Sequence, residues 1–238
     1  MMGHTHALSG AAGWMALVPV LDGQEFLGAT FSLGPGEIVA GALVCAGAAL
    51  LPDIDHHNST VTQTYGFVTK LISRVTNWVF GGHRNGTHSL FFAVLMGAGA
   101  HALGVYSPLA AQFLVFLLIG LALRGLGLGV PKNQVASEII NALITGGIVL
   151  ALFVSGVDYG WLGVVVALGC LLHFVGDMLT HMGCPLFWPV STTRVGQSFG
   201  FTTNGKVERL LVTPVLTIAV VLYSIYLFPW PQLLDDVV

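Results

Sequence analysis

Seven apolar stretches dominate this chain and restrict what it can fold into. They are separated by polar or Gly/Pro-rich breaks and run over residues 7–21, 37–52, 88–106, 109–130, 136–154, 161–181 and 210–228. A helix needs roughly 20 apolar residues to cross about 30 Å of hydrocarbon, and the last five stretches meet that length. The first two are shorter, so they either span a locally thinned bilayer or form a re-entrant hairpin. We therefore predict an all-α, polytopic membrane helical bundle of about seven membrane segments.

The composition agrees with a membrane location and excludes several other classes of protein. Only 8 % of the 238 residues are charged, whereas an ordinary soluble domain carries about 25 %, and 55 % are hydrophobic. These values exclude a soluble enzyme, a disordered chain and a nucleic-acid-binding protein. A bundle of this size leaves no room for a separate soluble domain, and we predict one membrane-embedded domain over residues 1–238.

Between the second and third stretches, residues 65–80 have the pattern of a helix that lies on the membrane surface. Lys70 and Arg74 are four residues apart and therefore lie on one side of a helix. Apolar residues recur beside them at helical spacing: Phe67, Leu71, Val75 and Trp78. The sequence thus predicts one interfacial amphipathic helix in addition to the membrane segments.

The basic residues predict the orientation of the bundle. Alternate assignment of the loops places the N-terminus and residues 53–87, 131–135 and 182–209 on one side of the membrane. All eight basic residues fall on that side or beside it: Lys70, Arg74, Arg84, Arg124, Lys132, Arg194, Lys206 and Arg209. The other side has carboxylates instead: Asp22, Glu25, Glu37, Asp158, Asp235 and Asp236. By the positive-inside rule, the basic side is predicted to be cytoplasmic.

Eight of the nine histidines also lie at the ends of segments assigned to the cytoplasmic side. They belong to four clusters: His4 with His6, Leu51-Pro52-Asp53-Ile54-Asp55-His56-His57, Gly82-His83-Arg84-Asn85-Gly86-Thr87-His88-Ser89, and His173 with Asp177 and His181. The last three residues lie within about 80° of one another on a helix that turns 100° per residue. We therefore expect four clusters that are distant in the sequence to converge at one membrane face.

Imidazole and carboxylate groups together are the ligands of Zn²⁺ and related divalent ions. Six to nine such groups exceed one tetrahedral site and suit two or three metals. Closely spaced metals activate water and clamp the attacking and leaving oxygens in the hydrolysis of phosphoesters or amides. Asp177 lies about one turn inside an apolar helix, where an unpaired carboxylate costs roughly 2.5–3.5 kcal/mol, so a metal is its simplest neutralising partner. The Arg84 guanidinium would bind a phosphate oxygen.

Structural interpretations stay open for several of these residues taken singly. In these interpretations, His4 and His6 are solvated terminal residues and Asp53 and Asp55 form a turn after a helix. Arg84 is a lipid-headgroup anchor, and His88 begins a helix. His101 lies deep in its segment, and we predict a packed or helix-bonded histidine there. Glu138 and Glu208 begin helices, where the helix dipole stabilises a carboxylate without any further function.

Six groups of residues carry a family resemblance. They are Gly3–His6, Leu51-Pro52-Asp53-Ile54-Asp55-His56 with Ser59, Gly82-His83-Arg84 with Thr87-His88-Ser89, His173-x3-Asp177-Met178-Leu179-Thr180, Gly183-x-Pro185 with Trp188-Pro189, and Gly205 with Glu208-Arg209. With them the chain resembles the LexA-regulated, membrane-bound metal-dependent hydrolases of the YdjM family. That family is distantly similar to zinc-dependent phospholipases C and single-strand zinc nucleases, which gather three zinc ions with His and Asp on a helical bundle.

The resemblance implies a multi-pass hydrolase with its metal ligands in these motifs. The implied ligands are His6, Asp53, Asp55, His56, His83, His88, His173 and Asp177, with His4, His57, His181 and Glu208 as second-rank candidates. We predict Asp55, Arg84 and Asp177 as catalytic residues, and either Asp53 or Asp55 as a bridge between metals. The cofactors would be two or three divalent ions of the zinc type, with manganese or magnesium as alternatives.

The sequence therefore favours a metal-dependent hydrolase of the inner (plasma) membrane with its site on the cytoplasmic side. The expected substrate is a phospholipid or other lipid-linked phosphate, cleaved at a phosphoester bond by metal-activated water. Three other classes stay open. A divalent-metal transporter would place its ligands near the bilayer midplane, a haem protein would pair histidines deep in facing helices, and a membrane metallopeptidase would use the same metal chemistry without an H-E-x-x-H motif.

Overall fold

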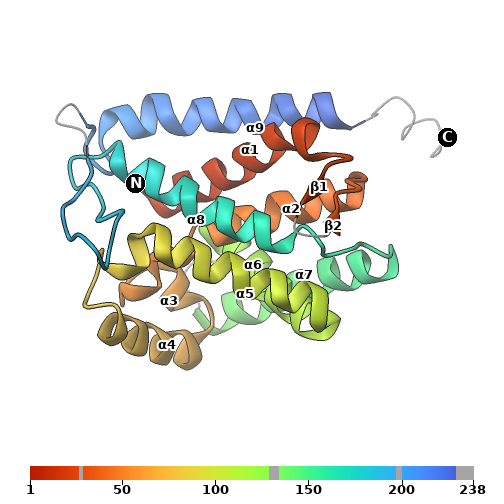
Figure 1. The fold of residues 1–238 in the computed structure, drawn as a ribbon, viewed down its shortest axis with the longest axis horizontal. Coiled ribbons are helices and arrows are strands. Elements are labelled where there is room, and N and C mark those ends of the chain that lie inside the picture. The colour runs from red at the N-terminus through yellow and green to blue at the C-terminus, as the bar shows by residue number, and fades with distance from the viewer. Residues whose placement is uncertain (27–28, 129–133, 197–199, 229–238) are drawn as a thin grey trace.

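Helices make up nearly all of the fold in the computed structural model, which describes residues 1–26, 29–128, 134–196 and 200–228 (Figure 1). The α-helices are α1 (Gly3–Leu21), α2 (Pro35–Ala48), α3 (Thr60–Thr64), α4 (Gly66–Val79), α5 (Leu90–Tyr106), α6 (Pro108–Gly125), α7 (Gln134–Val154), α8 (Leu162–Met178) and α9 (Thr213–Leu227). The shorter turns are the 3-10 helices η1 (Leu51–Asp55) and η2 (Gly86–His88) and the π-helical η3 (Glu208–Val212). Between α1 and α2, the two-residue strands β1 (Glu25–Phe26) and β2 (Ala29–Thr30) pair antiparallel.

In the part of the chain that the structure describes, each predicted apolar stretch lies on these helices, so the all-helical bundle is confirmed. Among the described residues, four helices are long and apolar enough to cross a membrane: Pro35–Asp55, Pro108–Gly125, Val135–Val154 and Glu208–Leu227. Helices α5 and α8 are also apolar but have 17 residues each. The count of about seven spans therefore stays a prediction. The last residues of the 109–130 stretch, Lys132, Asp235 and Asp236 lie outside the described residues.

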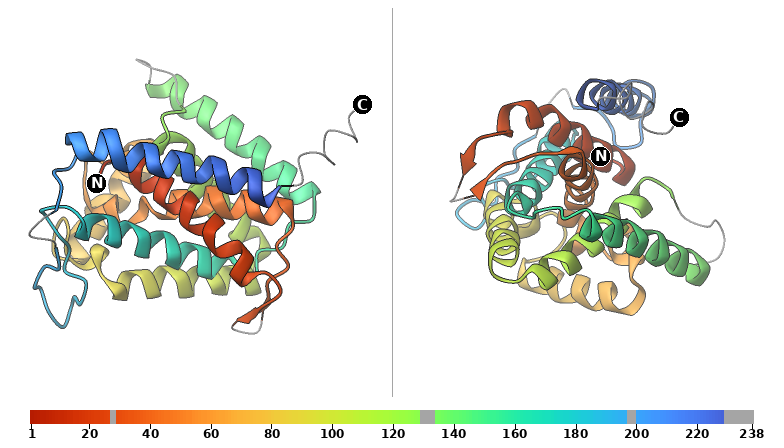
Figure 2. Two further views of the ribbon diagram at one scale, coloured as in Figure 1. Left: turned by 90° about the horizontal axis from the view of Figure 1, so that it is seen from above. Right: turned by 90° about the vertical axis from the view of Figure 1, so that its right-hand side faces the viewer.

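Helix α2 lies in the centre of the bundle, where it packs against α1, α6 and α8, while α9 lies along α1 at the outer edge (Figure 2). Glycines lie at two of the closest crossings of α2. A Cβ atom added at Gly10 of α1 would press on the carbonyl of Cys45, and one at Gly47 of α2 would press on that of Leu118. Small residues at such crossings let membrane helices approach closely. The glycines thus set the distances between the helices that carry the site.

The substitution Gly47→Ala should destabilise the bundle, because the added methyl group would clash with the backbone of α6. Overpacking of this kind costs about 1–3 kcal/mol, which outweighs the better helix propensity of alanine. The matched control is Gly146→Ala in α7, where no atom lies within 4 Å of the new Cβ. We expect the unfolding midpoint in detergent to fall for Gly47→Ala and to stay equal or rise for Gly146→Ala. Equal midpoints for both variants would contradict the close approach.

Candidate metal centre

Four segments that are distant in the sequence meet at one end of the bundle. They are the first turns of α1, the turn η1 after α2, the turn η2 before α5 and the last turns of α8. Their side chains form three overlapping groups that could hold a metal ion: His6–His173–Asp177, Asp53–His88–His173 and Asp53–Asp55–His83. The ends of the segments therefore converge as the sorting of the loops predicts.

His173 is held by a close crossing of α8 over the end of α2. A Cβ atom at Gly169 would lie 2.6 Å from the Ala48 Cβ, so only glycine allows this approach. One turn later, the His173 Nδ1 lies 2.7 Å from the carbonyl oxygen of Ala49, to which it must donate its proton. The Nε2 atom of the neutral ring then keeps a free lone pair, which is the arrangement that orients a metal-binding histidine.

Thr87 and Asp55 fix the tautomer of His88, as the Ala49 carbonyl fixes that of His173. The Thr87 hydroxyl donates its one proton to the Asp55 Oδ2 at 2.6 Å and therefore accepts from the His88 Nδ1 at 3.0 Å. The His88 Nε2 is then also a free acceptor, and it lies 3.2 Å from the His173 Nε2. Two lone pairs at this distance repel each other unless a cation or a proton lies between them. Both rings are fully buried, so water offers no relief.

One carboxylate oxygen from each of two aspartates also lies near these lone pairs, which gives four candidate metal-ligand atoms. The Asp53 Oδ1 lies 3.6 Å from the His88 Nε2 and 3.9 Å from the His173 Nε2. The Asp177 Oδ2 lies 3.7 Å from each of the same nitrogens. Ligands about 2.0–2.1 Å from a tetrahedral zinc ion are about 3.3–3.4 Å apart. The two nitrogens thus have the spacing of neighbouring zinc ligands, and each carboxylate oxygen lies a few tenths of an ångström beyond that spacing from both of them.

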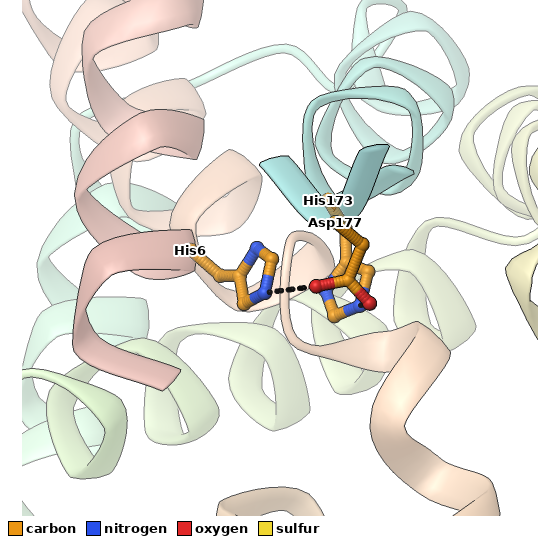
Figure 3. A group of neighbouring side chains, drawn as sticks. All are labelled: His6, His173 and Asp177. Atoms are coloured by element: carbon orange, nitrogen blue, oxygen red, sulfur yellow. Dashed lines mark ion pairs between the residues drawn. The ribbon is translucent and has the colours of Figure 1, made fainter. Parts of the chain in front are cut away.

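A second group lies on the other side of Asp177 (Figure 3). The His6 Nε2 is 3.4 Å from the Asp177 Oδ1, and the His6 ring stacks on that of His173 with centroids 3.8 Å apart. Both ring nitrogens of His6 are buried and lack a hydrogen-bond partner among the residues that the structure describes. The amino nitrogen of Met1 lies 2.6 Å from the same carboxylate oxygen. The Asp177 Oδ1 thus faces His6 and the Met1 amine. Its Oδ2 faces His88, His173 and Arg84, so the carboxylate lies between two ligand groups. The expectation that a metal is the simplest neutralising partner of Asp177 is corrected, because the Met1 amine and Arg84 both contact it.

Asp55 holds the third group together. Its Oδ1 lies 2.7 Å from the His83 Nδ1, and its Oδ2 accepts from the backbone N–H of Arg84 at 2.9 Å and from the Thr87 hydroxyl. The side chain is fully buried. Since each oxygen already has a strong partner, Asp55 fixes the loop that carries His83, Arg84 and His88 as well as offering a ligand atom.

Arg84 reaches into the centre from this loop. Its backbone has a left-handed φ of 57°, and its Nη2 lies 3.1 Å from the Asp177 Oδ2. The Nη1 atom is buried and has no hydrogen-bond partner within the described part of the chain. A planar guanidinium with one free edge beside a cluster of metal-ligand residues suits an anionic oxygen.

The remaining predicted ligands lie at the edge of this cluster or away from it. His56 packs between His57 and His83 at the rim, where it lines a cavity of about 270 Å³ together with Asp53 and Ser59. Burial and the neighbouring His83 lower the pKa of His56. The groups found among the described residues leave out five predicted candidates: His4, His56, His57, His181 and Glu208.

Three of these five side chains lie outside the cluster of metal-ligand groups. His57 and His181 are exposed. Glu208 is fully buried and accepts from the backbone N–H groups of Met2 and Asn204 at 2.6 Å each, so it joins the start of α1 to η3. The bond from Asn204, just before the start of this helix, agrees with the helix-start interpretation, whereas the bond from Met2 has no signal in the sequence. His101 lies on α5 against Gly163, outside the metal-ligand groups of the described chain.

Comparison with known families agrees with the sequence motifs. The model of the YdjM inner membrane protein family matches residues 1–128 and 139–231. No curated protein and no solved structure is detectably similar. The chain therefore belongs to the YdjM inner membrane protein family and is a multi-pass protein of the inner membrane with buried His/Asp groups that could bind metal.

Proposed function

We propose that this member of the YdjM family is a membrane-embedded metal-dependent hydrolase. It would cleave a phosphoester bond in a phospholipid or other lipid-linked phosphate, at a site that faces the cytoplasm. One observation carries the proposal: the free lone pairs of His88 and His173 face each other at 3.2 Å, beside Asp53 and Asp177. Buried lone pairs that face each other need a cation or a shared proton, and Asp53 and His173, which each belong to two of the three groups, suit two or three zinc-type ions.

Each of the chain's own residues at the site would have a separate role. Bound ions of this type supply an activated water and hold phosphoryl oxygens. Asp177 and Asp53 would set the distance between neighbouring ligand groups. The Ala49 carbonyl accepts the Nδ1 proton of His173 and so keeps the Nε2 of this ring available to a metal ion. Arg84 offers its free Nη1 to a phosphoryl oxygen, while Asp55 fixes the backbone of that residue. The cavity beside Asp53, His56 and Ser59 would admit the headgroup.

Two features favour a phosphorylated lipid over a peptide. The unpaired nitrogen of Arg84 matches an anionic oxygen better than a neutral amide. The ligand groups also lie at one end of the helical bundle, at the depth where headgroups meet the hydrocarbon if the helices cross the bilayer. The excess of Lys and Arg on the same side supports a cytoplasmic orientation.

The first test is the metal content of protein purified in detergent. We expect at least two divalent ions per chain by elemental mass spectrometry, and the loss of at least one of them in Asp177→Asn, since both oxygens of Asp177 face ligand groups. The matched control is Asp158→Asn, which removes a carboxylate that contacts only the backbone of Tyr159 among the described residues. Less than one ion per chain, unchanged in Asp177→Asn, would refute the metal centre.

The reaction itself is tested separately. Incubation of the purified protein with a total lipid extract, followed by mass spectrometry of lipids and headgroups, should reveal a phosphoester product that chelators abolish. Metal uptake into proteoliposomes without any such product would instead indicate a transporter.

A further inference from the structure

Helix α4 has its polar side turned inward and its apolar side turned outward. Its buried residues are Thr69 and Ser73. The exposed ones are mainly large and apolar: Phe67, Val68, Leu71, Ile72, Val75, Trp78 and Val79, with Trp78 84 % exposed. In water such a surface would be costly, and its exposure indicates contact with lipid.

The inner side of α4 is attached to the turn that carries two of the site's aspartates. The Asn77 side chain donates to the backbone carbonyl of Asp55 at 2.8 Å, and the Thr69 hydroxyl donates to the carbonyl of Thr62 at 2.8 Å. Beyond the helix, Gly81 and Gly82 have φ values of 75° and 101°, and His83 follows directly. Helix α4 therefore lies between η1 and the His83 loop. It is bonded to η1 through Asn77, and the chain continues from α4 into the His83 loop through the two glycines.

The length and charge of α4 indicate what lies against its outer side. Fourteen residues make a helix of about 21 Å, too short to cross about 30 Å of hydrocarbon. Lys70 and Arg74 are exposed on one flank between the polar and apolar sides, and the helix contains no carboxylate. Neither residue forms an ion pair within the described part of the chain. Apolar residues flanked by unpaired cations match the boundary between acyl chains and anionic headgroups.

We propose that the outer face of α4 docks into an anionic lipid leaflet and thereby holds the metal-ligand turns at headgroup depth. Trp78 inserts among the upper parts of the acyl chains, while Lys70 and Arg74 contact anionic headgroups. The anchoring of the helix fixes η1 through Asn77 and the His83 loop through the two glycines. This inference does not require that the centre be a hydrolase.

The proposal is tested with full-length protein in liposomes that contain brominated lipids, which quench nearby tryptophans. The difference between wild type and Trp78→Phe isolates the signal of Trp78. We expect strong quenching of this signal, greater for bromines near the headgroup end of the acyl chain than for bromines near its tail. A Trp78 signal that aqueous iodide quenches and brominated lipid does not would overturn the proposal.

The anionic preference is tested in the same liposomes. At equal mole fraction, brominated phosphatidylglycerol should quench Trp78 roughly two-fold more than brominated phosphatidylcholine. The double variant Lys70→Gln/Arg74→Gln should lose this difference, whereas the matched control Lys206→Gln/Arg209→Gln, which changes two exposed cations elsewhere, should keep it. Equal quenching of the wild type by both lipids would overturn the anionic docking.

Discussion

Replacement of His173 by alanine should remove at least one bound ion and, with it, the proposed hydrolysis. His173 is shared by two of the three ligand groups, and its Nε2 lies 3.2 Å from the His88 Nε2 and less than 4 Å from a carboxylate oxygen of each of Asp53 and Asp177. We expect the loss of at least one ion per chain and a fall in phosphoesterase activity of roughly 10³-fold or more, since groups that act as one unit fail together. Elemental analysis and hydrolysis of a chromogenic phosphodiester in detergent measure the two effects.

The control for this variant is His101→Ala. His101 is a helix histidine of the same membrane bundle, but it lies on α5 against Gly163 and outside the ligand groups among the described residues. Its metal content should equal that of the wild type. If His173→Ala instead kept its full metal content and remained folded by its unfolding midpoint, the facing lone pairs would not mark a metal site.

Sequence patterns alone predict which segments meet at the site. The alternation of apolar stretches and loops places the ends of four segments on one side, and in the structure these ends meet through pairs such as His6–Asp177 and His88–Asp53. Each end is predictable because a helix that crosses the membrane must return its polar residues to one of two faces. The segments that meet are therefore predictable from topology, but topology does not separate the residues of the ligand groups from His57 and His181, which are exposed.

The internal geometry of the cluster is not predictable in this way. The partner of His173 is the backbone carbonyl of Ala49, which carries no sequence signal, and it meets the ring only because Gly169 lets α8 approach α2. The sequence hypothesis named Asp53 or Asp55 as the bridging carboxylate. The distances make Asp177 a further candidate, because its two oxygens face different groups. Both oxygens of Asp55 are instead bonded to the loop that carries His83 and Arg84. Such details depend on side-chain packing across helices.

The orientation of α4 is a similar case. The spacing of Lys70 and Arg74 beside apolar residues predicts an amphipathic helix, and the helix is present over Gly66–Val79. Periodicity cannot tell which side faces the protein, because an apolar face suits a core as well as a lipid. The structure answers this through Asn77 and Thr69, whose hydrogen bonds place the polar side inward.

Replacement of Arg84 by lysine should separate substrate binding from metal binding. Lysine keeps the positive charge near Asp177 but lacks the planar fork, so it cannot contact that carboxylate and also offer a second donor in a fixed direction. We expect the metal content to stay at the wild-type level and kcat/KM for a phosphodiester to fall about 10²-fold, as for the loss of one donor to a developing charge. Elemental analysis and steady-state kinetics on the same preparation give both values.

Arg194→Lys is the matched control, because Arg194 is exposed on the loop after α8. It should leave metal content and kinetics unchanged. Because Arg84 contacts the centre only through Asp177 and the backbone bond to Asp55, a loss of metal in Arg84→Lys would make it a structural support of the ligands. A variant with full metal content and full activity would show that the free Nη1 does not bind substrate. Only retained metal with reduced kcat/KM assigns the guanidinium to the phosphoryl oxygens, and that outcome also favours a phosphoester over an amide, whose neutral carbonyl gains less from a second cationic donor.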